Sequence, residues 1–349
     1  MAFRFADSFD HYTTTAQMRT KWTSVDTNVY PVAAAGRNGT AGIAGVTGGG
    51  SSIKQFKKTL DNQATWIVGI AVKMSAATSH AGFAVEFLDG GTVQVGVYNN
   101  TDLTLEVRRN GSSGTLLATS TNSLTVGTYY YIEFKAIIDN AGTYEVRVNG
   151  TSTGWIPSAS GDTQQSVNAY ANVININTIS GLGLQHVYDD LYICDGTTGE
   201  DPTYPNNSFL GDIRVAMVLP NEIGTYSEFT PTAGNNYTCV DETTPNDDTD
   251  YVYTSGVGNV DTYGFAALPV TSGTILGIQT VPYARKDDAG SRSISSTLYY
   301  NSILYSGSPK SLGDTYSYYP EIFETNPNTE ERWTISEINA AEFGEKLES

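Results

Sequence analysis

The chain of 349 residues is long enough for two ordinary domains, and its 39% of hydrophobic residues can fill their cores, so disorder is not expected. Its formal net charge of −18 argues against nonspecific nucleic-acid binding, because neutralising phosphates requires clustered Lys and Arg. The sequence has no long apolar run, and no basic segment followed by an apolar stretch at its start. We therefore expect neither membrane insertion nor a signal peptide.

The first part of the chain is predicted to form many short strands. Strands are expected near residues 2–10, 29–35, 40–47, 52–58, 65–74, 81–88, 92–98, 103–109, 115–119, 129–138, 143–149 and 187–194, and one short helix near 15–20. Tight turns separate several strands, among them Asp89-Gly90-Gly91 and Asn110-Gly111. Short strands at such intervals favour a β-sandwich over a fold of alternating strands and helices.

The clearest hairpin joins the strands at 129–138 and 143–149. Every second residue from Tyr130 to Ile138 is apolar, which is the period of two expected for a strand with one buried face. The turn between the strands has the sequence Asp-Asn-Ala-Gly, whose residue types favour chain reversal. This segment predicts an antiparallel sheet with one face in a core.

The clearest domain boundary is the segment 195–208, which contains turn formers, two prolines and no apolar periodicity. We therefore expect a first domain at 1–195, a linker at 196–208 and a second, β-rich domain at 209–349. In the second domain, strands are expected at 213–219, 274–281 and 293–300, the last two flanking a hairpin tip at 287–290. The stretch 333–347 has a helix-capping residue type at Thr334 or Ser336 and the apolar spacing of a docking helix.

Two cysteines, Cys194 and Cys239, are too few for a metal cluster or a disulfide scaffold. Each lies in a segment of alternating apolar residues, so buried reduced thiols are the favoured interpretation. A disulfide between the two halves of the chain is the alternative.

Residues suited to catalysis are sparse. The three histidines are scattered along the chain, so their spacing supports neither a zinc triad nor a Ser-His-Asp set. Glu86, Asp189 and Asp190 are the nearest carboxylates for glycoside hydrolysis, but neighbours on a strand point to opposite faces, so Asp189 and Asp190 cannot act as a pair. We therefore expect no catalytic residues and no enzymatic activity; a depolymerase is the least favoured alternative.

One acidic segment suggests a bound cation. Asp241, Asp247, Asp248 and Asp250 gather around Pro245, and Ca²⁺ prefers carboxylate and carbonyl oxygens supplied by a turn. The spacing is not that of an EF-hand, so a solvated acidic loop is the other interpretation. A second acidic group consists of Asp195, Glu200 and Asp201. Calcium is the one cofactor that the sequence suggests.

Aromatic residues are frequent near the C-terminus. The strongest group is Tyr299, Tyr300, Tyr316, Tyr318, Tyr319 and Trp333. Because one small β domain does not readily bury so many rings, we expect some of them on an assembly surface. Exposed Tyr rings also stack on sugars, so glycan recognition is the alternative interpretation.

Three segments carry, together with the hairpin, a resemblance to known proteins. They are the opening Phe5–Tyr12 (FADSFDHY), the strand Trp66–Val72 (WIVGIAV) and the late strand Tyr188–Asp195 (YDDLYICD). In this order they resemble bacteriophage virion structural proteins with an N-terminal concanavalin A-like or laminin-G-like domain. The resemblance spans nearly the whole chain and brings no catalytic motif. It implies an all-β fold: a jelly-roll sandwich followed by a second β-rich domain with a short C-terminal helix.

The resemblance also implies a function and a location. It suggests a non-enzymatic virion component made in host cytoplasm, such as a multi-copy decoration, neck or tail-associated protein. Its partners would be other virion proteins and copies of itself, contacted through the C-terminal domain. The alternative is an adhesin of the tail-fibre type, in which the sandwich binds a polysaccharide of the host surface.

Overall fold

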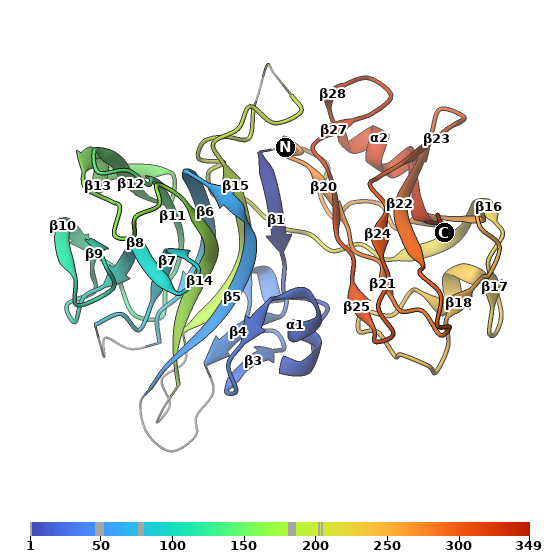
Figure 1. The fold of residues 1–349 in the computed structure, drawn as a ribbon, viewed down its shortest axis with the longest axis horizontal. Helices are drawn as coiled ribbons and strands as arrows, with labels where there is room; N and C mark the ends of the chain where they lie inside the picture. The colour runs from blue at the N-terminus through green and yellow to red at the C-terminus, as the bar shows by residue number, and fades with distance from the viewer. Residues whose placement is uncertain (1, 46–51, 76–79, 181–185, 202, 204) are drawn as a thin grey trace. The chain divides into compact units, whose positions relative to one another are not determined.

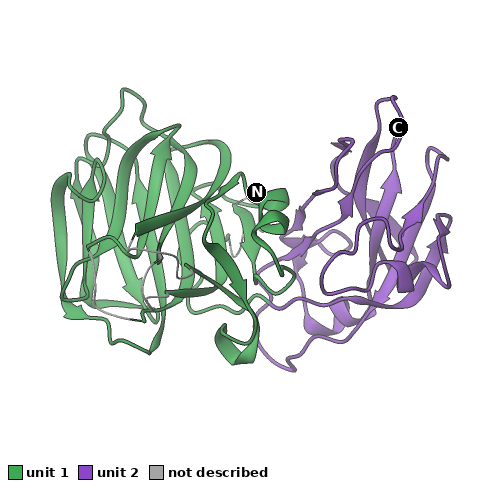
Figure 2. Cartoon of the chain, turned by 90° about the horizontal axis from the view of Figure 1, so that it is seen from below, with its two compact units in different colours: residues 1–215 green, residues 216–349 purple. Residues whose placement is uncertain are grey.

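The computed structural model describes residues 2–349 apart from 46–51, 76–79, 181–185, 202 and 204. Contacts divide the chain into two compact units, Met1–Val215 and Ala216–Ser349, which Figure 2 colours separately. This division falls later than the linker that the sequence suggests at 196–208. Arg37 explains part of the difference, because its guanidinium donates to Ile213 O at 3.2 Å and pairs with Asp212 at 2.7 Å, which ties residues 212–213 to the first unit.

The first unit is built from two antiparallel sheets (Figure 1), which confirms the all-β sandwich expected from the sequence. Sheet A has the order β13-β12-β11-β6-β15-β4-β3, with β1 beside β15. Its strands are β1 (Phe3–Asp7), β3 (Val29–Val32), β4 (Gly42–Gly45), β6 (Thr65–Lys73), β11 (Tyr129–Ile137), β12 (Gly142–Val148), β13 (Thr151–Gly161) and β15 (Val187–Asp195).

Sheet B has the order β10-β9-β8-β7-β14-β5-β2. Its strands are β2 (Ser24–Val25), β5 (Ser52–Gln63), β7 (Ala84–Asp89), β8 (Thr92–Asn99), β9 (Thr104–Arg109), β10 (Thr115–Ser123) and β14 (Ala171–Ser180). The two sheets bury their facing apolar side chains against each other. Phe87 of sheet B stacks on Phe134 of sheet A with ring centroids 4.8 Å apart, and both are fully buried.

A buried carboxylate fixes the start of the chain against this core. Helix α1 (Thr15–Lys21) begins with a capping box between Thr14 and Gln17, and it delivers Lys21 to the buried Asp7 at 3.3 Å. Tyr12 OH and Trp22 Nε1 donate to the same carboxylate at 2.7 and 2.8 Å. Burial by itself raises the pKa of Asp7, but Lys21 and these neighbours outweigh it and hold the pKa below its ordinary value.

The second unit is β-rich, as expected. Its main sheet has the order β16-β19-β29-β22-β23, with β24 beside β22. These strands are β16 (Pro220–Ser227), β19 (Val260–Phe265), β22 (Ser293–Tyr300), β23 (Ile303–Ser306), β24 (Lys310–Ser311) and β29 (Glu342–Leu347). Four short pairs join β17 (Thr230–Pro231) to β18 (Val252–Tyr253), β20 (Ile278–Thr280) to β26 (Glu321–Phe323), β21 (Tyr283–Ala284) to β25 (Ser317–Tyr318), and β27 (Thr325–Asn326) to β28 (Glu331–Arg332).

Several expected elements of the second unit take another form. Helix α2 (Ile335–Ala340) begins at the predicted cap Thr334 but ends after six residues, and β29 follows it between β19 and β22. Residues 213–219 form no strand, and β20 pairs with β26, so the hairpin predicted around 287–290 is wrong. Among the described residues, no helix is long and apolar enough to cross a membrane.

We predict that Asp7→Ala destabilises the first unit by about 3–5 kcal/mol, because it leaves the Lys21 ammonium buried without its partner. The measurement is urea unfolding followed by tryptophan fluorescence. The matched control is Asp61→Ala, which removes a carboxylate that is 54% exposed and should cost under about 1 kcal/mol. Equal losses in the two variants would contradict the role of Asp7.

Candidate functional site

Polar side chains form two rows across the outer face of sheet B. Side chains alternate along each strand, so the residues between the apolar core positions point away from sheet A. Strand register aligns them. One row runs Lys57, Asn175, Glu86, Gly96, Arg108, and the other runs Gln55, Asn177, Ala84, Tyr98, Glu106. The rows therefore bring together residues of five strands: β5, the consecutive strands β7, β8 and β9, and β14, which lies far from them in the sequence.

Glu86 lies at the centre of these rows and is 6% exposed. Tyr98 OH donates to its Oε1 at 2.8 Å, and Asn175 Nδ2 donates to its Oε2 at 2.5 Å. Burial raises the pKa of Glu86 above its ordinary value, and these two hydrogen bonds and the charge of Lys57 offset only part of that effect. A carboxyl group of this kind can hold or release a proton nearer neutral pH than an exposed glutamate can.

Gly96 makes the contact between Tyr98 and Glu86 possible. A Cβ atom at position 96 would come within 2.7 Å of Tyr98 OH and 3.0 Å of Glu86 Cγ. The phenol ring of Tyr98 therefore lies across the space where another residue would place its side chain. This glycine is explained by a close approach, and its backbone needs no left-handed conformation.

Asn175 has an unused acceptor. Its Nδ2 donates to Glu86 and also to Asn177 Oδ1 at 2.9 Å, and Gln55 Nε2 donates to the same Asn177 oxygen at 3.2 Å. Asn175 Oδ1 is fully buried and has no hydrogen-bond partner among the residues that the structure describes. Because buried polar atoms are nearly always paired, this oxygen marks incomplete hydrogen bonding at the centre of the rows.

The other end of the rows is partly open to solvent. Glu106 accepts from Arg108 Nε at 2.7 Å and lies 3.2 Å from His80 Nε2. The side chains of Arg108 and His80 are 20% and 31% exposed, whereas that of Glu106 is 7% exposed. This end therefore presents a cation and an imidazole to solvent above a buried carboxylate.

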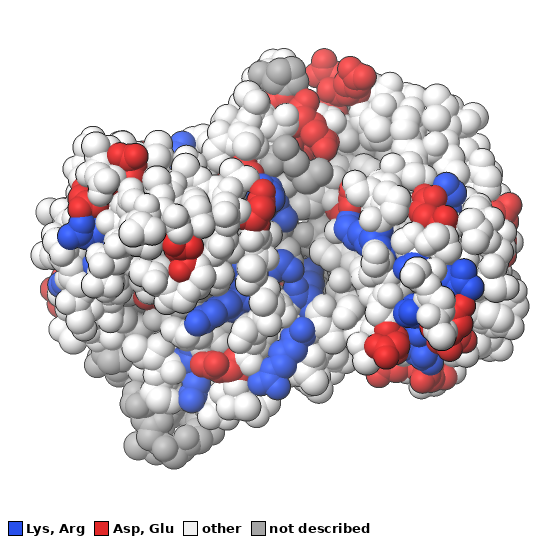
Figure 3. Space-filling view, viewed as in Figure 1, with Lys and Arg blue, Asp and Glu red and all other residues white. Residues whose placement is uncertain are grey.

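Charge is unevenly divided between the units. The first unit has 13 Lys and Arg against 18 Asp and Glu, and the second has 6 against 19, so most of the negative charge lies in the second. On the face seen in Figure 3, Lys and Arg side chains gather on the first unit where β5 and α1 lie in Figure 1. The sandwich is thus less repulsive to an acidic ligand than the charge of the whole chain implies.

The carboxylates suggested for calcium do not converge on one point. Asp247 accepts from Tyr283 OH at 3.1 Å, Asp248 pairs with Arg285 at 3.0 Å, and Asp250 accepts from Asn246. Asp241 lies in the same loop. In the second acidic group, Asp195 pairs with Arg4 at 2.5 Å. No group of three or more possible metal ligands occurs within the described residues.

The two other carboxylates considered for catalysis hold loops in place. Asp189 Oδ2 accepts from Arg37 N at 2.6 Å, and Asp190 Oδ1 accepts from Val215 N at 2.8 Å. Both belong to sheet A, whereas Glu86 belongs to sheet B. A pair of Glu86 with Asp190 is therefore not formed.

The aromatic residues suggested for assembly are mostly inside the second unit. Trp333 is 3% exposed and packs with Leu298, Phe323 and Phe343, and Tyr299 and Tyr300 are half-buried. Tyr318 is 8% exposed, and Tyr319 OH accepts from Gly313 N. Tyr316 stacks on Tyr283 at 5.2 Å. The two cysteines are buried and unlinked, one in each unit.

Apart from Glu86, the residues of the rows are not among the candidates expected from the sequence. No strand is expected between 150 and 186, where β13 and β14 lie. The missed signal is the alternation in residues 171–180, ANVININTIS, in which Ile174 and Ile176 are buried in the core while Asn175 and Asn177 point outward. Asn lowers strand propensity, but the alternation itself indicates a strand.

No protein-family model matches the chain, and no curated protein matches its sequence. Three similar solved structures each cover about half of it. A variant of the alginate lyase Aly36B bound to an alginate tetrasaccharide has 11% identity and a TM-score of 0.40, covering 54% of this chain and 95% of its own. The PL-14 alginate lyase of Aplysia kurodai has 8% identity and a TM-score of 0.42, covering 55% of this chain and 98% of its own. A carbohydrate esterase of the Shiga toxin-encoding bacteriophage phi24B has 12% identity and a TM-score of 0.36, covering 55% of this chain and 100% of its own.

These comparisons correct two expectations. A non-enzymatic virion structural protein was expected, but the similar solved structures are carbohydrate-active enzymes, so the structural role and the absence of enzymatic activity are both wrong by this comparison. At these TM-scores and identities, however, the likeness assigns neither an activity nor a substrate to this chain. What the protein binds has to be argued from its own residues.

We predict that ionisation of Glu86 destabilises the fold. Because its folded pKa is raised, the folded state binds more protons than the unfolded state, and stability falls as pH rises from about 4.5 through the raised pKa. Glu86→Gln cannot ionise at this position. The melting temperature of the variant minus that of the wild type should therefore increase from pH 4 to pH 8. The control is Glu222→Gln, which removes an exposed carboxylate. A difference between Glu86→Gln and wild type that does not change with pH would contradict this account.

Proposed function

We propose that the first unit binds a polysaccharide across the outer face of sheet B. The observation that carries the proposal is the pair of hydrogen-bonded cross-strand rows, which end in the partly exposed Arg108 and His80. Amide, carboxylate, phenol and guanidinium groups held in fixed positions are suited to the many hydroxyl groups of a sugar chain. Their fixed geometry lowers the cost of ordering them when a ligand binds.

The dimensions favour a chain over a single sugar. Four strand spacings separate Lys57 from Arg108, which is roughly 19 Å at about 4.8 Å per spacing. The half-buried Gln55 and Lys57 lie at one end, and the partly exposed His80 and Arg108 lie at the other. A bound chain would contact these exposed groups at the two ends of the rows.

The binding test is affinity electrophoresis of the full chain through gels containing polyuronate or neutral polysaccharides. The resemblance to bacteriophage proteins suggests including polysaccharides of bacterial surfaces. We expect wild-type protein to be retarded by at least one polysaccharide. Tyr98→Phe and Arg108→Gln should each weaken that binding by about tenfold, because each removes a hydrogen-bonding group from the rows.

The matched control for binding is Arg292→Gln, which removes a cation from an exposed ion pair of the second unit. It should be retarded like the wild type. If no polysaccharide retards the protein, or if Tyr98→Phe and Arg108→Gln migrate like the control, the outer face of sheet B is not the binding site.

Polysaccharide cleavage at Glu86 is a second candidate function. The observation favouring it is the raised pKa of this buried carboxyl group beside Tyr98, with Glu106 two strands away. Strand spacing separates the backbones of β7 and β9 by roughly 10 Å, and paired carboxyl groups of glycoside hydrolases lie about 5–9.5 Å apart. Glu86 would then hold the proton for a leaving oxygen, and Glu106 would be the partner carboxylate.

Cleavage is tested by release of reducing ends from the polysaccharide that the protein binds. The expected result is activity in the wild type and a loss of at least about a hundredfold in Glu86→Gln, because the amide cannot donate the proton. Binding by Glu86→Gln should persist, which separates the two functions. Equal activity of the variant and the wild type would rule out Glu86 as the acid, and no activity in either would leave binding as the function of the face.

A further inference from the structure

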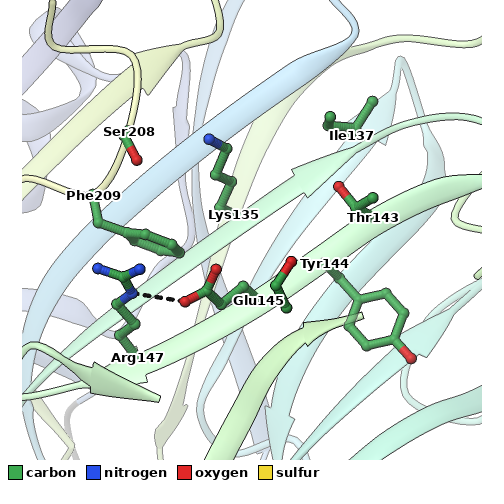
Figure 4. A pocket seen from close by; sticks show the side chains of 9 residues that line it. Lys135, Ile137, Thr143, Tyr144, Glu145, Arg147, Ser208 and Phe209 are labelled. Atoms are coloured by element: carbon green, nitrogen blue, oxygen red, sulfur yellow. Dashed lines mark hydrogen bonds and ion pairs between the residues drawn. The ribbon is translucent and has the colours of Figure 1, made fainter. Parts of the chain in front are cut away.

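A pocket lies on the opposite sheet of the sandwich. It has a volume of about 170 Å³ and is lined by outward residues of β11 and β12, by Ser158 of β13 and by the segment at Ser208 and Phe209. Figure 4 shows Lys135, Glu145 and Arg147 projecting toward the same space beside Phe209. Sheet A carries this pocket, so it shares no residue with the rows of sheet B.

Arg147 is fixed in this pocket. Its Nε donates to Glu145 at 2.7 Å, and its guanidinium lies over the Phe209 ring, 4.2 Å from the ring centroid. The stacking and the ion pair hold the planar group in one orientation, so its terminal nitrogens are ready to donate to a ligand. Neither terminal nitrogen makes a hydrogen bond within the part of the chain that the structure describes.

Lys135 supplies a positive charge that is not neutralised. It stands opposite Glu145 in the strand register, yet Glu145 is paired with Arg147, and Lys135 makes no ion pair with any described residue. Glu133, opposite Arg147, does not line the pocket. Its carboxylate is fully buried and accepts from Tyr192 OH at 2.5 Å and from Gly211 N at 2.8 Å. The side chains that line the pocket therefore carry about one net positive charge.

The remaining lining groups suit a sugar ring. Thr143, Ser158 and Ser208 supply hydroxyl groups, and Phe209 supplies an apolar ring. A volume of about 170 Å³ corresponds to about five or six water molecules, which limits a ligand to a small ring. One net positive charge, the hydroxyl groups of Thr143, Ser158 and Ser208, and the Phe209 ring together suit a small monoanion that also carries hydroxyl groups.

We propose that this pocket binds a single acidic sugar residue through its carboxylate, with Lys135 and Arg147 as the carboxylate partners and Phe209 against the ring. The proposal does not rest on polysaccharide binding at sheet B, because the two sites use different sheets. A carboxylate fits the two cations because Arg donates in a fork and Lys donates as a point charge.

The test is isothermal titration of the full chain with sodium glucuronate, glucose and sodium sulfate. We expect glucuronate to bind and glucose to bind at least about tenfold more weakly, since it lacks the charged hydrogen-bonding group. Lys135→Gln should weaken glucuronate binding by at least about tenfold as well. Lys73→Gln removes the same charge from another strand of sheet A and should bind glucuronate like the wild type.

Three outcomes would overturn the proposal. Glucuronate binding by Lys135→Gln equal to that of Lys73→Gln would place the ligand elsewhere. Equal binding of glucose and glucuronate would remove the role of the carboxylate. Sulfate binding as tightly as glucuronate would show a site for anions only, because the sugar ring would then contribute nothing.

Discussion

The candidate site depends on the register of β14 between β5 and β7. This register puts Asn175 between Lys57 and Glu86, and the next pairing puts Gly96 beside Glu86. A shift of one residue would turn Asn175 and Asn177 into the core and Ile174 and Ile176 out to solvent. The free energy of burying the two isoleucines therefore also fixes the polar rows, and the site follows from the core on the other side of the same strand.

The strand register alone does not offset the cost of burying the Glu86 carboxylate. A buried carboxylate is costly unless it is hydrogen-bonded, and Glu86 has two donors for its two oxygens. One of these donors, Tyr98, is available only because Gly96 leaves room for its ring. The raised pKa of Glu86 shows that the compensation is incomplete. Such incomplete compensation is common at functional sites, where a strained or desolvated group is retained for binding or chemistry.

Much of the fold could be predicted from the sequence, because the signals are local. The apolar alternation at 129–138 predicted β11, the turn residues predicted many short strands, and Thr334 predicted the start of α2. The end of that helix could not be predicted in the same way. Residues 342–347 have the spacing of a helix face, but pairing with β19 and β22 supplies hydrogen bonds on both sides and overrides that local preference.

The candidate site was less predictable for a physical reason. Its residues come from five strands, and their proximity is set by strand order, which the sequence does not state. Glu86 was recognised as a carboxylate, but its partners Tyr98 and Asn175 lie 12 and 89 positions away. The acidic loop and the aromatic C-terminal region form recognisable patterns because their residues are contiguous in sequence. In the fold, their side chains bind separate partners or pack in the core of the second unit.

The most direct measurement is a crystal structure of the full chain with an oligosaccharide prepared from whichever polysaccharide retards it most strongly. The account predicts sugar density along the outer face of sheet B, with contacts to Lys57 at one end of the rows and to Arg108 and His80 at the other. Density confined to any other surface, with the rows of sheet B unchanged and in contact with solvent alone, would contradict it.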